Sequence, residues 1–360
     1  MGGYTNTRDI MGDQETLDAL IAHTLTTFTD ESVTQVGNNA FYNQAQMEEI
    51  CLPNVGSIGS NAFYGCSGMK RFKIGLEKGT VATLSSYSAF SGTGRSAIYV
   101  PDALVSTYKA ASQWSNAAVK DRIFGISDME NGVEWDETEI SDSWDTIAAK
   151  VNAGTAAENY SAGQYKDVDL GTEGIIRMQI VAKNTDPLFS GEGNAQLTWI
   201  AMDLLATTHR MNPALDNNTE GTGSIGGFAA SEMRTYLLET IWPLLPEVVK
   251  GIIKPVRKYS RAYDTSGSAV NNVETSETLW IPSHREMFGD SSYETTGPTY
   301  AFAFPDNATR IRKRYGNASA ESWWLRSAFG ASYWRCVYSD GSAYSDGASS
   351  AYGVCLGFCT

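Results

Sequence analysis

A 22-residue internal repeat near the N-terminus constrains the fold more than any other feature of the sequence. Residues 36–42, Val-Gly-Asn-Asn-Ala-Phe-Tyr, return as residues 58–64, Ile-Gly-Ser-Asn-Ala-Phe-Tyr. Repeats of this length stack into solenoids, because one unit cannot bury its apolar side chains alone. We therefore expect a short solenoid with the Ala-Phe pairs pointing inward and strands at Glu49–Leu52 and Arg71–Ile74.

The stack is expected to end soon after a third, degenerate copy. Ser88–Phe90 repeats the Ala-Phe pair, and Ala97–Val100 is apolar enough to form the accompanying strand. Pro101-Asp102 is typical of a helix start, so we expect a helix over Ala103–Trp114. Its apolar side would cover the open end of the solenoid.

This segment resembles the BspA-like leucine-rich repeat family over about residues 33–125. The resemblance rests on Val55–Met69, on Ile98–Leu104 and on Tyr108-Lys109. It implies a stacked scaffold for presentation or partner contact, with no chemistry of its own. We assign residues 1–125 to an N-terminal segment that contains these repeats and their capping helix.

A second domain is expected after a polar, acidic stretch. Residues 126–142 have the composition of a linker, so the second domain would span residues 143–360. Residues 144–151 predict a short helix, residues 163–181 alternate as strands do, and residues 231–242 form an amphipathic pattern that ends at a proline. The fold class expected for the whole chain is α+β.

The C-terminal segment has the pattern of short strands joined by tight turns. We expect strands at Trp323–Ser327, Tyr333–Tyr338 and Gly353–Phe358. The two Asp-Gly pairs, in Ser339–Gly341 and Ser345–Gly347, predict turns between strands.

Charge and hydropathy exclude several classes of function. The 360 residues carry a formal net charge of −14, which argues against a general nucleic-acid or anionic-membrane binder. The apolar runs fall short of the roughly 20 residues that a membrane span needs. Two basic stretches, Lys250–Arg261 and Arg310–Arg314, are interpreted as solvated or domain-contact surfaces, with a binding patch as the alternative. Met1–Asp30 lacks the pattern of a signal peptide.

Motifs for catalysis, cofactors and metals are weak. Gly221–Gly226 matches GxGxxG, but no apolar strand precedes it, so we interpret it as a loop. No P-loop or nucleophile elbow occurs. His23, His209 and His284 are far apart in the sequence, and the cysteines lack zinc-site spacing. We expect no enzyme activity, no cofactor and no metal site.

The segment Ser322–Thr360 stands out by composition. It holds nine aromatic residues, eight Ser, five Gly and five Ala, with four charged residues. Aromatic rings with Ser and Gly are typical of binding surfaces, because rings offer large contact area with few rotors to freeze. The alternative is an ordinary β core that buries Trp323, Val337 and Val354 together with the tyrosines. We favour exposed binding aromatics.

Residues 143–360 resemble the variable proteins of diversity-generating retroelements. The resemblance is carried by Ser-Trp-Trp-Leu-Arg-Ser at 322–327, the closing segment 353–359, and the upstream segments 209–213, 234–237 and 280–283. It implies a C-type lectin fold related to the formylglycine-generating-enzyme branch. It also implies that a reverse transcriptase rewrites C-terminal positions at template adenines, and that the protein binds host receptors from a phage particle.

Adenine rewriting of Asn codons yields Phe, Ser, Tyr, Ala, Gly, Asp, Arg or Cys, but not Trp. Trp334 and Val337 are therefore the expected fixed points, and Cys355 is left open as a rewritten position or a buried framework thiol. The candidate ligand-binding positions are Phe329, Gly330, Ala331, Ser332, Tyr333, Arg335, Tyr338, Ser342, Ala343, Tyr344, Ser345, Ser349, Ser350, Ala351 and Tyr352.

The sequence departs from two neighbouring families. The EPN, QPD and WND triplets of calcium-dependent lectins are absent, so we expect binding without calcium. A formylglycine-generating oxidase would need a reactive cysteine pair, for which Cys336 with Cys355 or Cys359 are the only late candidates.

The leading hypothesis is a non-enzymatic phage protein on the virion that binds a protein or glycan receptor on the host surface. The repeats would attach or space it, without nucleic-acid or membrane partners, and a homo-oligomer is left open. The alternatives are a bacterial cell-surface adhesin and, third, an oxidase of the formylglycine-generating type.

Overall fold

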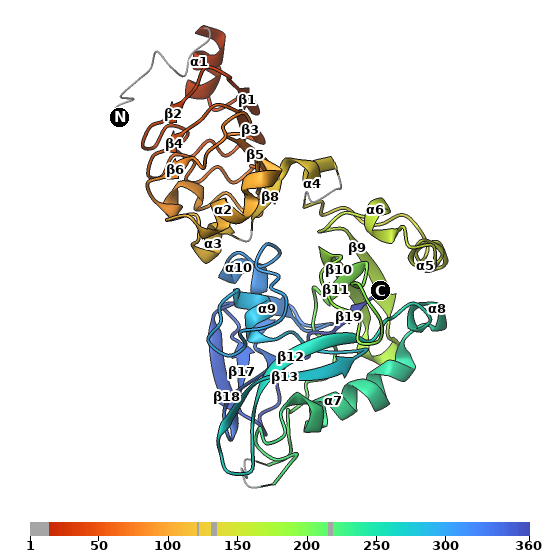
Figure 1. Cartoon of the computed structure of the whole chain (residues 1–360). Helices are drawn as coiled ribbons and strands as arrows, with labels where there is room; N and C mark the ends of the chain where they lie inside the picture. The colour runs from red at the N-terminus through yellow and green to blue at the C-terminus, as the bar shows by residue number, and fades with distance from the viewer. Residues whose placement is uncertain (1–13, 121, 131–134, 215–218) are drawn as a thin grey trace. The chain divides into compact units, whose positions relative to one another are not determined.

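The computed structural model describes residues 14–120, 122–130, 135–214 and 219–360, in two compact units, Met1–Trp135 and Asp136–Thr360 (Figure 1). The division falls inside the expected linker, residues 126–142. Both ends of that range are ordered, however. Helix α4 (Ile126–Glu130) belongs to the first unit, and Ile140 is buried in the second, where its N–H donates to Tyr165 O (2.8 Å). Residues at both ends of the range 126–142 therefore belong to the folded units.

The first unit is a solenoid of parallel strands that follows helix α1 (Gln14–Ile21). Ile50 pairs with Phe72, which is the period of the repeat seen in the sequence. The three expected strands are present, and one further strand lies at each end of the main sheet. That sheet runs in the order β1 (Thr27–Thr29), β3 (Glu49–Leu52), β5 (Arg71–Ile74), β7 (Ala97–Val100), β8 (Ile123–Gly125); a second contains β2 (Gln35–Val36), β4 (Ser57–Ile58) and β6 (Thr83–Leu84).

Repeating phenylalanines form the core of the solenoid. The rings of Phe41 and Phe63 lie 5.6 Å apart, and Phe63 lies 5.5 Å from Phe90, which belongs to the 3₁₀ turn η1 (Tyr87–Phe90). All three side chains are buried. The inward orientation expected for the Ala-Phe pairs is confirmed, including that of the degenerate third copy.

The cap of the solenoid is formed by shorter helices than expected. A 3₁₀ turn, η2 (Asp102–Leu104), leads into α2 (Val105–Ala110), and α3 (Ala117–Lys120) follows. The expected helix to Trp114 ends early, and Gln113 adopts a left-handed φ of 64°, which an α-helix does not accommodate. Trp114 still covers Phe90 (ring centroids 5.5 Å apart) and donates to Ala82 O (2.7 Å).

The second unit begins with two helices, α5 (Trp144–Asn152) and α6 (Ala156–Asn159), and a four-stranded antiparallel sheet. The sheet runs in the order β19, β11, β10, β9. The last strand of the chain closes it, because Phe358 pairs with Trp199. The strands are β9 (Tyr165–Asp169), β10 (Ile175–Lys183), β11 (Leu197–Ala201) and β19 (Gly357–Cys359), with the 3₁₀ turn η3 (Gly171–Glu173) between β9 and β10.

A helical segment and a long hairpin follow (Figure 1). The expected amphipathic helix starts at Glu232 and buries Met233, Leu237 and Ile241, but its second half is a π-helical turn. The elements are η4 (Phe228–Ala230), α7 (Glu232–Tyr236), η5 (Leu237–Ile241), η6 (Trp242–Leu244), α8 (Glu247–Lys250), the hairpin β12 (Val256–Tyr263) and β13 (Ala269–Glu277), α9 (His284–Phe288), α10 (Asn307–Arg310), β14 (Arg312–Lys313) and β15 (Ala320–Glu321).

A three-stranded antiparallel sheet carries the C-terminal candidate residues. It consists of β16 (Trp323–Gly330), β17 (Tyr333–Val337) and β18 (Ala343–Gly347), in that order. The turn expected at Ser345–Gly347 is wrong, because these residues pair within β18. The other expected turn, Ser339–Gly341, is confirmed: it precedes β18, and the Asp340 side chain accepts from the Ser342 N–H (2.9 Å). None of the described helices is long and apolar enough to cross a membrane.

Candidate ligand-binding surface

The fifteen candidate positions are all exposed or half-buried, whereas the positions expected to be fixed are buried. The largest exposed rings are Phe329 (47% exposed), Tyr333 (48%), Tyr338 (43%) and Tyr344 (53%). Tyr352 is half-buried. The alternative of an all-buried aromatic core therefore holds for the tryptophans and for Val337 and Val354, but not for these four rings.

Strand alternation divides the surface between two faces of the sheet. Arg335 lies opposite Ser345, and Cys336 lies opposite Tyr344. Directly opposite residues of antiparallel strands share a face, and successive residues alternate between faces. The candidate residues thus form two groups, which we name the Arg335 group and the Asp346 group after the residue at the centre of each.

The Arg335 group joins a charged side chain to two rings. The Arg335 guanidinium lies 5.6 Å from the Phe329 ring and 5.0 Å from the Tyr293 ring. Its Nη1 donates to Ser345 Oγ (2.7 Å), and its Nε lies 3.4 Å from His284 Nδ1. A guanidinium over an aromatic face gains cation–π attraction without losing its hydrogen-bond donors.

His284 is fixed beside this group by helix α9. Ser283 caps the helix through a capping box with Glu286, and His284 Nε2 lies 2.9 Å from Asp290 Oδ2. Because the Arg335 Nε–H can only donate, His284 Nδ1 acts as the acceptor and Nε2 donates to Asp290. The hydrogen bond from His284 holds the pKa of Asp290 well below its usual range.

The Asp346 group lies on the other face of β17 and β18. Tyr352 OH donates to Asp346 Oδ2, and Ser350 Oγ donates to Asp346 Oδ1 (3.2 Å). Burial and the neighbouring Asp346 carboxylate raise the pKa of Tyr352. The rings of Tyr338 and Tyr344 contact each other at 5.1 Å. In this group, one phenol is bound to the Asp346 carboxylate and two others contact each other.

The turn between β16 and β17 is anchored through its backbone. Ser224 Oγ donates to Gly330 O (2.6 Å), and the Ser224 N–H donates to Ala331 O (2.8 Å). Gly223 O accepts from Trp334 Nε1 (2.8 Å). The segment Gly221–Gly226, which we expected to be a loop, therefore holds β17 through this hydrogen bond. These hydrogen bonds to the turn use the backbone carbonyls of Gly330 and Ala331 and none of its side chains.

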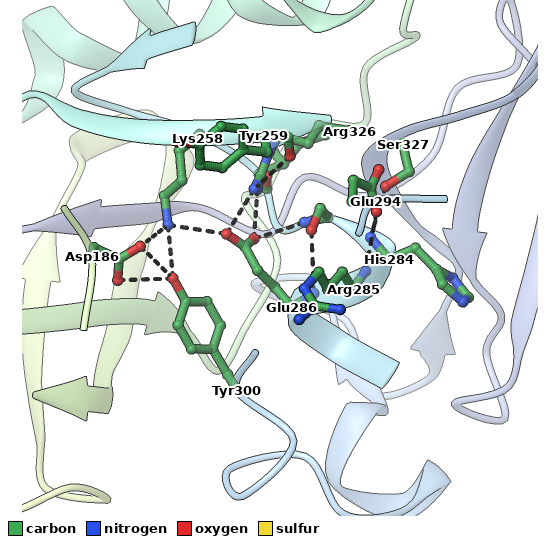
Figure 2. A network of polar contacts seen from close by, with 12 residues as sticks. Asp186, Lys258, Tyr259, His284, Arg285, Glu286, Glu294, Tyr300, Arg326 and Ser327 are labelled. Atoms are coloured by element: carbon green, nitrogen blue, oxygen red, sulfur yellow. Dashed lines mark hydrogen bonds and ion pairs between the residues drawn. The ribbon is translucent and has the colours of Figure 1, made fainter. Parts of the chain in front are cut away.

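A completely buried ionic network fixes the first strand of the sheet (Figure 2). Arg326 on β16 forms two hydrogen bonds to Glu286 on α9 (2.6 and 2.7 Å). Lys258 on β12 contacts Glu286 (3.1 Å) and Asp186 (2.6 Å), and it donates to Tyr300 OH (2.7 Å). Its Nζ also lies 3.6 Å from the centre of the Trp280 ring. Two cations and two carboxylates neutralise each other.

Charge pairing explains why the network tolerates burial. Burial alone would raise the pKa of Glu286, but Arg326 and Lys258 outweigh it and lower that pKa to about 2. A buried pair is stable only while both partners remain. Lys258 belongs to a basic stretch that we interpreted as a surface, and Arg310 and Arg312 of the other stretch are buried too. That interpretation is wrong for these three residues.

The late cysteines are buried thiols. Burial raises the pKa of Cys336 to about 12 and that of Cys355 to about 11, and it raises the pKa of Cys359 strongly. Cys355 Sγ donates to Ala201 O (3.4 Å), as a framework residue would. Among the described residues, no group of three or more His, Cys, Asp and Glu side chains could hold a metal ion.

Several residues of the surface were not among the sequence candidates. Asp346 was assigned to a turn, and Tyr293, His284 and Arg261 come from segments that precede the sheet in the sequence. No local pattern marks them, because only the tertiary packing of α9 and β12 against β16 brings them to the candidate strands. The sequence offered one signal for Asp346: it is one of only four charged residues in Ser322–Thr360. That signal did not indicate a role in binding.

Comparisons with known proteins cover both units in part. Residues 23–117 match a family model described as a BspA type leucine rich repeat region, in six copies. Residues 23–117 are a leucine-rich repeat region. Residues 205–359 match a model described as a domain of unknown function (DUF6273). No curated protein and no solved structure matches the chain. The second match excludes β11, although β19 pairs with that strand, so the folded unit is larger than the matched domain.

Proposed function

We propose that the second unit is a non-enzymatic ligand-binding module and that β16, β17 and β18 carry its contact surface. One observation carries the proposal: all fifteen candidate positions are exposed or half-buried, while Trp334 and Cys336, which alternate with Tyr333 and Arg335 along β17, are completely buried. A surface built in this way can change its side chains without changing its core. Exposed substitutions usually alter stability by less than about 0.5 kcal/mol.

The finer proposal is that this surface is diversified by a retroelement on a C-type lectin fold of the formylglycine-generating-enzyme branch. Two features support it. The C-terminal strand β19 closes a sheet begun early in the unit, so the chain returns to its starting layer. The segments that carry the resemblance also lie in the framework: Trp280 covers Lys258, and Arg234 pairs with Glu277 (2.9 Å).

We propose a phage particle as the location and a host-surface protein or glycan as the ligand, with the repeats as the attachment or spacing element. The alternative is a bacterial cell-surface adhesin, which the repeat region favours by itself. An oxidase of the formylglycine-generating type is third. The raised pKa values of Cys336 and Cys355 weigh against it, because a thiolate is the reactive form.

The diversification proposal is tested in the source genome. We expect a near-copy of the region that encodes Trp324–Thr360 beside a reverse-transcriptase gene, with differences concentrated at adenines. The differing codons should map to the fifteen candidate positions and spare Trp334 and Val337. A genome with neither the near-copy nor the reverse transcriptase would contradict the proposal.

The binding proposal is tested with labelled full-length protein and a panel of intact bacterial cells. We expect the chain to bind at least one strain, and the triple variant Tyr333→Ala, Tyr338→Ala, Tyr344→Ala to lose that binding while it remains folded. Retained binding by a folded triple variant would place the contact surface elsewhere. A thermal melt of each preparation separates lost binding from lost folding.

A further inference from the structure

Arg261 lies beside the Arg335 group and has unused hydrogen-bonding capacity. Its guanidinium carbon lies 5.3 Å from the Tyr263 ring and 5.6 Å from the Tyr293 ring. Its Nε is buried and has no hydrogen-bond partner among the described residues. The residue as a whole is only half-buried, so the guanidinium keeps hydrogen-bond donors that no described residue accepts from.

Arg335 approaches the same ring. The Tyr293 ring lies 5.0 Å from the Arg335 guanidinium carbon, so both cations contact one aromatic ring. In the described part of the chain, neither arginine has a carboxylate within ion-pair distance. The nearby acids are otherwise engaged: Asp290 accepts from His284, and Glu294 accepts from the backbone N–H of Arg261 (3.0 Å).

Other arginines of the same unit show the usual arrangement. Arg177, Arg210 and Arg257 each pair with a carboxylate at 2.6–3.3 Å. In a chain with a net charge of −14, acidic partners are plentiful. Two guanidinium groups that contact one ring, each without a carboxylate partner, therefore make the surroundings of Tyr293 locally positive. Such a site can attract an anion despite the overall charge, because distant charges are screened beyond about 8 Å at physiological ionic strength.

We propose that Arg261, Tyr293 and Arg335 form a subsite for the carboxylate of an acidic sugar. The inference deepens the proposed function, on which it rests. A guanidinium fork matches a carboxylate geometrically. The exposed ring of Phe329 lies beside Arg335, and the exposed ring of Tyr333 belongs to the same face of β17. Both rings offer apolar area for the face of a sugar ring.

The subsite joins a constant part to a variable part. Arg335 and Phe329 are among the candidate variable positions, whereas Arg261 and Tyr293 precede the segment Ser322–Thr360 altogether. Diversification would therefore change the contacts around the anion but keep one cation and one ring. Variants of this surface would share a preference for acidic ligands while they differ in the rest of the glycan that they select.

The test uses full-length protein and immobilised glycans in matched pairs. Each pair contains an oligosaccharide that ends in a sialic or uronic acid and the same oligosaccharide after reduction of its carboxyl group. We expect the protein to bind at least one acidic member about tenfold more tightly than its reduced partner, the size typical of one charge-assisted hydrogen bond. Arg261→Gln should abolish that difference, and raised salt should weaken it.

Arg177→Gln is the matched control, because Arg177 also stacks on a tyrosine (4.1 Å from the Tyr165 ring) and lies on β10, outside the surface. It should leave glycan preference unchanged. Equal binding of acidic and reduced glycans, preference for sulfated or phosphorylated glycans or acidic peptides, or an unchanged Arg261→Gln variant would overturn the subsite.

The cell-binding assay separates the two proposals. If binding to cells requires the three tyrosines but Arg261→Gln leaves both cell binding and glycan preference unchanged, the subsite is wrong and the binding surface stands. If folded protein binds no cell, or binds independently of the tyrosines, the proposed function fails and the subsite fails with it. Equal melting temperatures for wild type and Arg261→Gln are required in either comparison.

Discussion

Trp334 and Arg335 are consecutive residues of β17 with opposite environments. Trp334 is completely buried and donates from Nε1 to Gly223 O (2.8 Å), whereas Arg335 is partly exposed and donates to Ser345 Oγ (2.7 Å). One residue holds the strand in the fold and the next is available to a ligand. Along β17, this alternation is the physical basis for separating stability from binding.

Substitutions at these two positions should differ in their effect on the free energy of unfolding. We expect Trp334→Ala to lower it by about 3–5 kcal/mol, because the change leaves a large cavity and removes a buried hydrogen bond. Arg335→Ala should lower it by at most about 1 kcal/mol, because the Ser345 contact is partly solvated. Urea unfolding measures both values, and similar losses would contradict the separation.

The Glu286 network should make stability depend on acid. The pKa of Glu286 falls from an ordinary 4.5 to about 2 in the folded protein, so its contribution is present above pH 4.5 and is lost as the pH falls toward 2. This loss corresponds to about 3 kcal/mol. Urea unfolding at intervals from pH 5 to pH 2 should show it.

Glu286→Gln is the matching variant. It leaves Lys258 and Arg326 buried with one carboxylate fewer, so we expect about 3–5 kcal/mol of destabilisation at pH 7. Between pH 4.5 and pH 2, the free energy of unfolding of this variant should fall less steeply than that of the wild type, because Glu286 no longer titrates. Asp145→Asn, at an exposed position of α5, serves as a control. An unchanged slope in Glu286→Gln would show that the network does not hold Glu286 ionised.

The thiols should react unequally with an alkylating reagent near neutral pH. Cys51 is partly exposed, whereas Cys66, Cys336, Cys355 and Cys359 are buried. We expect alkylation of native protein to modify Cys51 first and the buried thiols only after unfolding, as read by peptide mass spectrometry. Rapid modification of Cys336 or Cys355 in folded protein would contradict this prediction and support the oxidase alternative, which needs reactive thiols.

The solenoid cap should be removable without damage to the second unit. Trp114→Ala uncovers Phe90 and deletes the hydrogen bond to Ala82 O, so we expect about 3–5 kcal/mol of destabilisation confined to the repeats. Hydrogen exchange should accelerate in β5, β7 and β8 and stay unchanged in β16–β18. Faster exchange across both units would show that they unfold together.

Local patterns predicted the parts of the fold that depend on neighbouring residues. The Ala-Phe period gave the solenoid strands, because each repeat repeats the same packing. Trp334 and Val337 were expected as fixed positions from the amino acids that adenine rewriting can produce, and both are buried. Local patterns failed at Ser345–Gly347, where an Asp-Gly pair indicated a turn, but Asp346 accepts from Tyr352 and Ser350 and stays in β18.

The buried network lay beyond sequence reasoning for a different reason. Its charged residues come from separate parts of the second unit: Asp186, Lys258, Glu286 and Arg326. Each is of a type that is usually found on the surface. Only tertiary contacts make them neutralise one another. The same holds for Arg261 and Tyr293, which reach the candidate surface through β12 and the segment after α9.

We expect that the side chains of the candidate surface can be replaced while the buried residues beneath them cannot. A pair of libraries of the full-length protein tests this difference most directly. One randomises the fifteen candidate positions, and the other randomises fifteen buried positions of the same unit, including Trp323, Trp334 and Arg326. Resistance to proteolysis and sequencing of survivors report folding. We predict that most members of the first library remain resistant and few of the second do. Equal loss of resistance in both libraries would contradict the account.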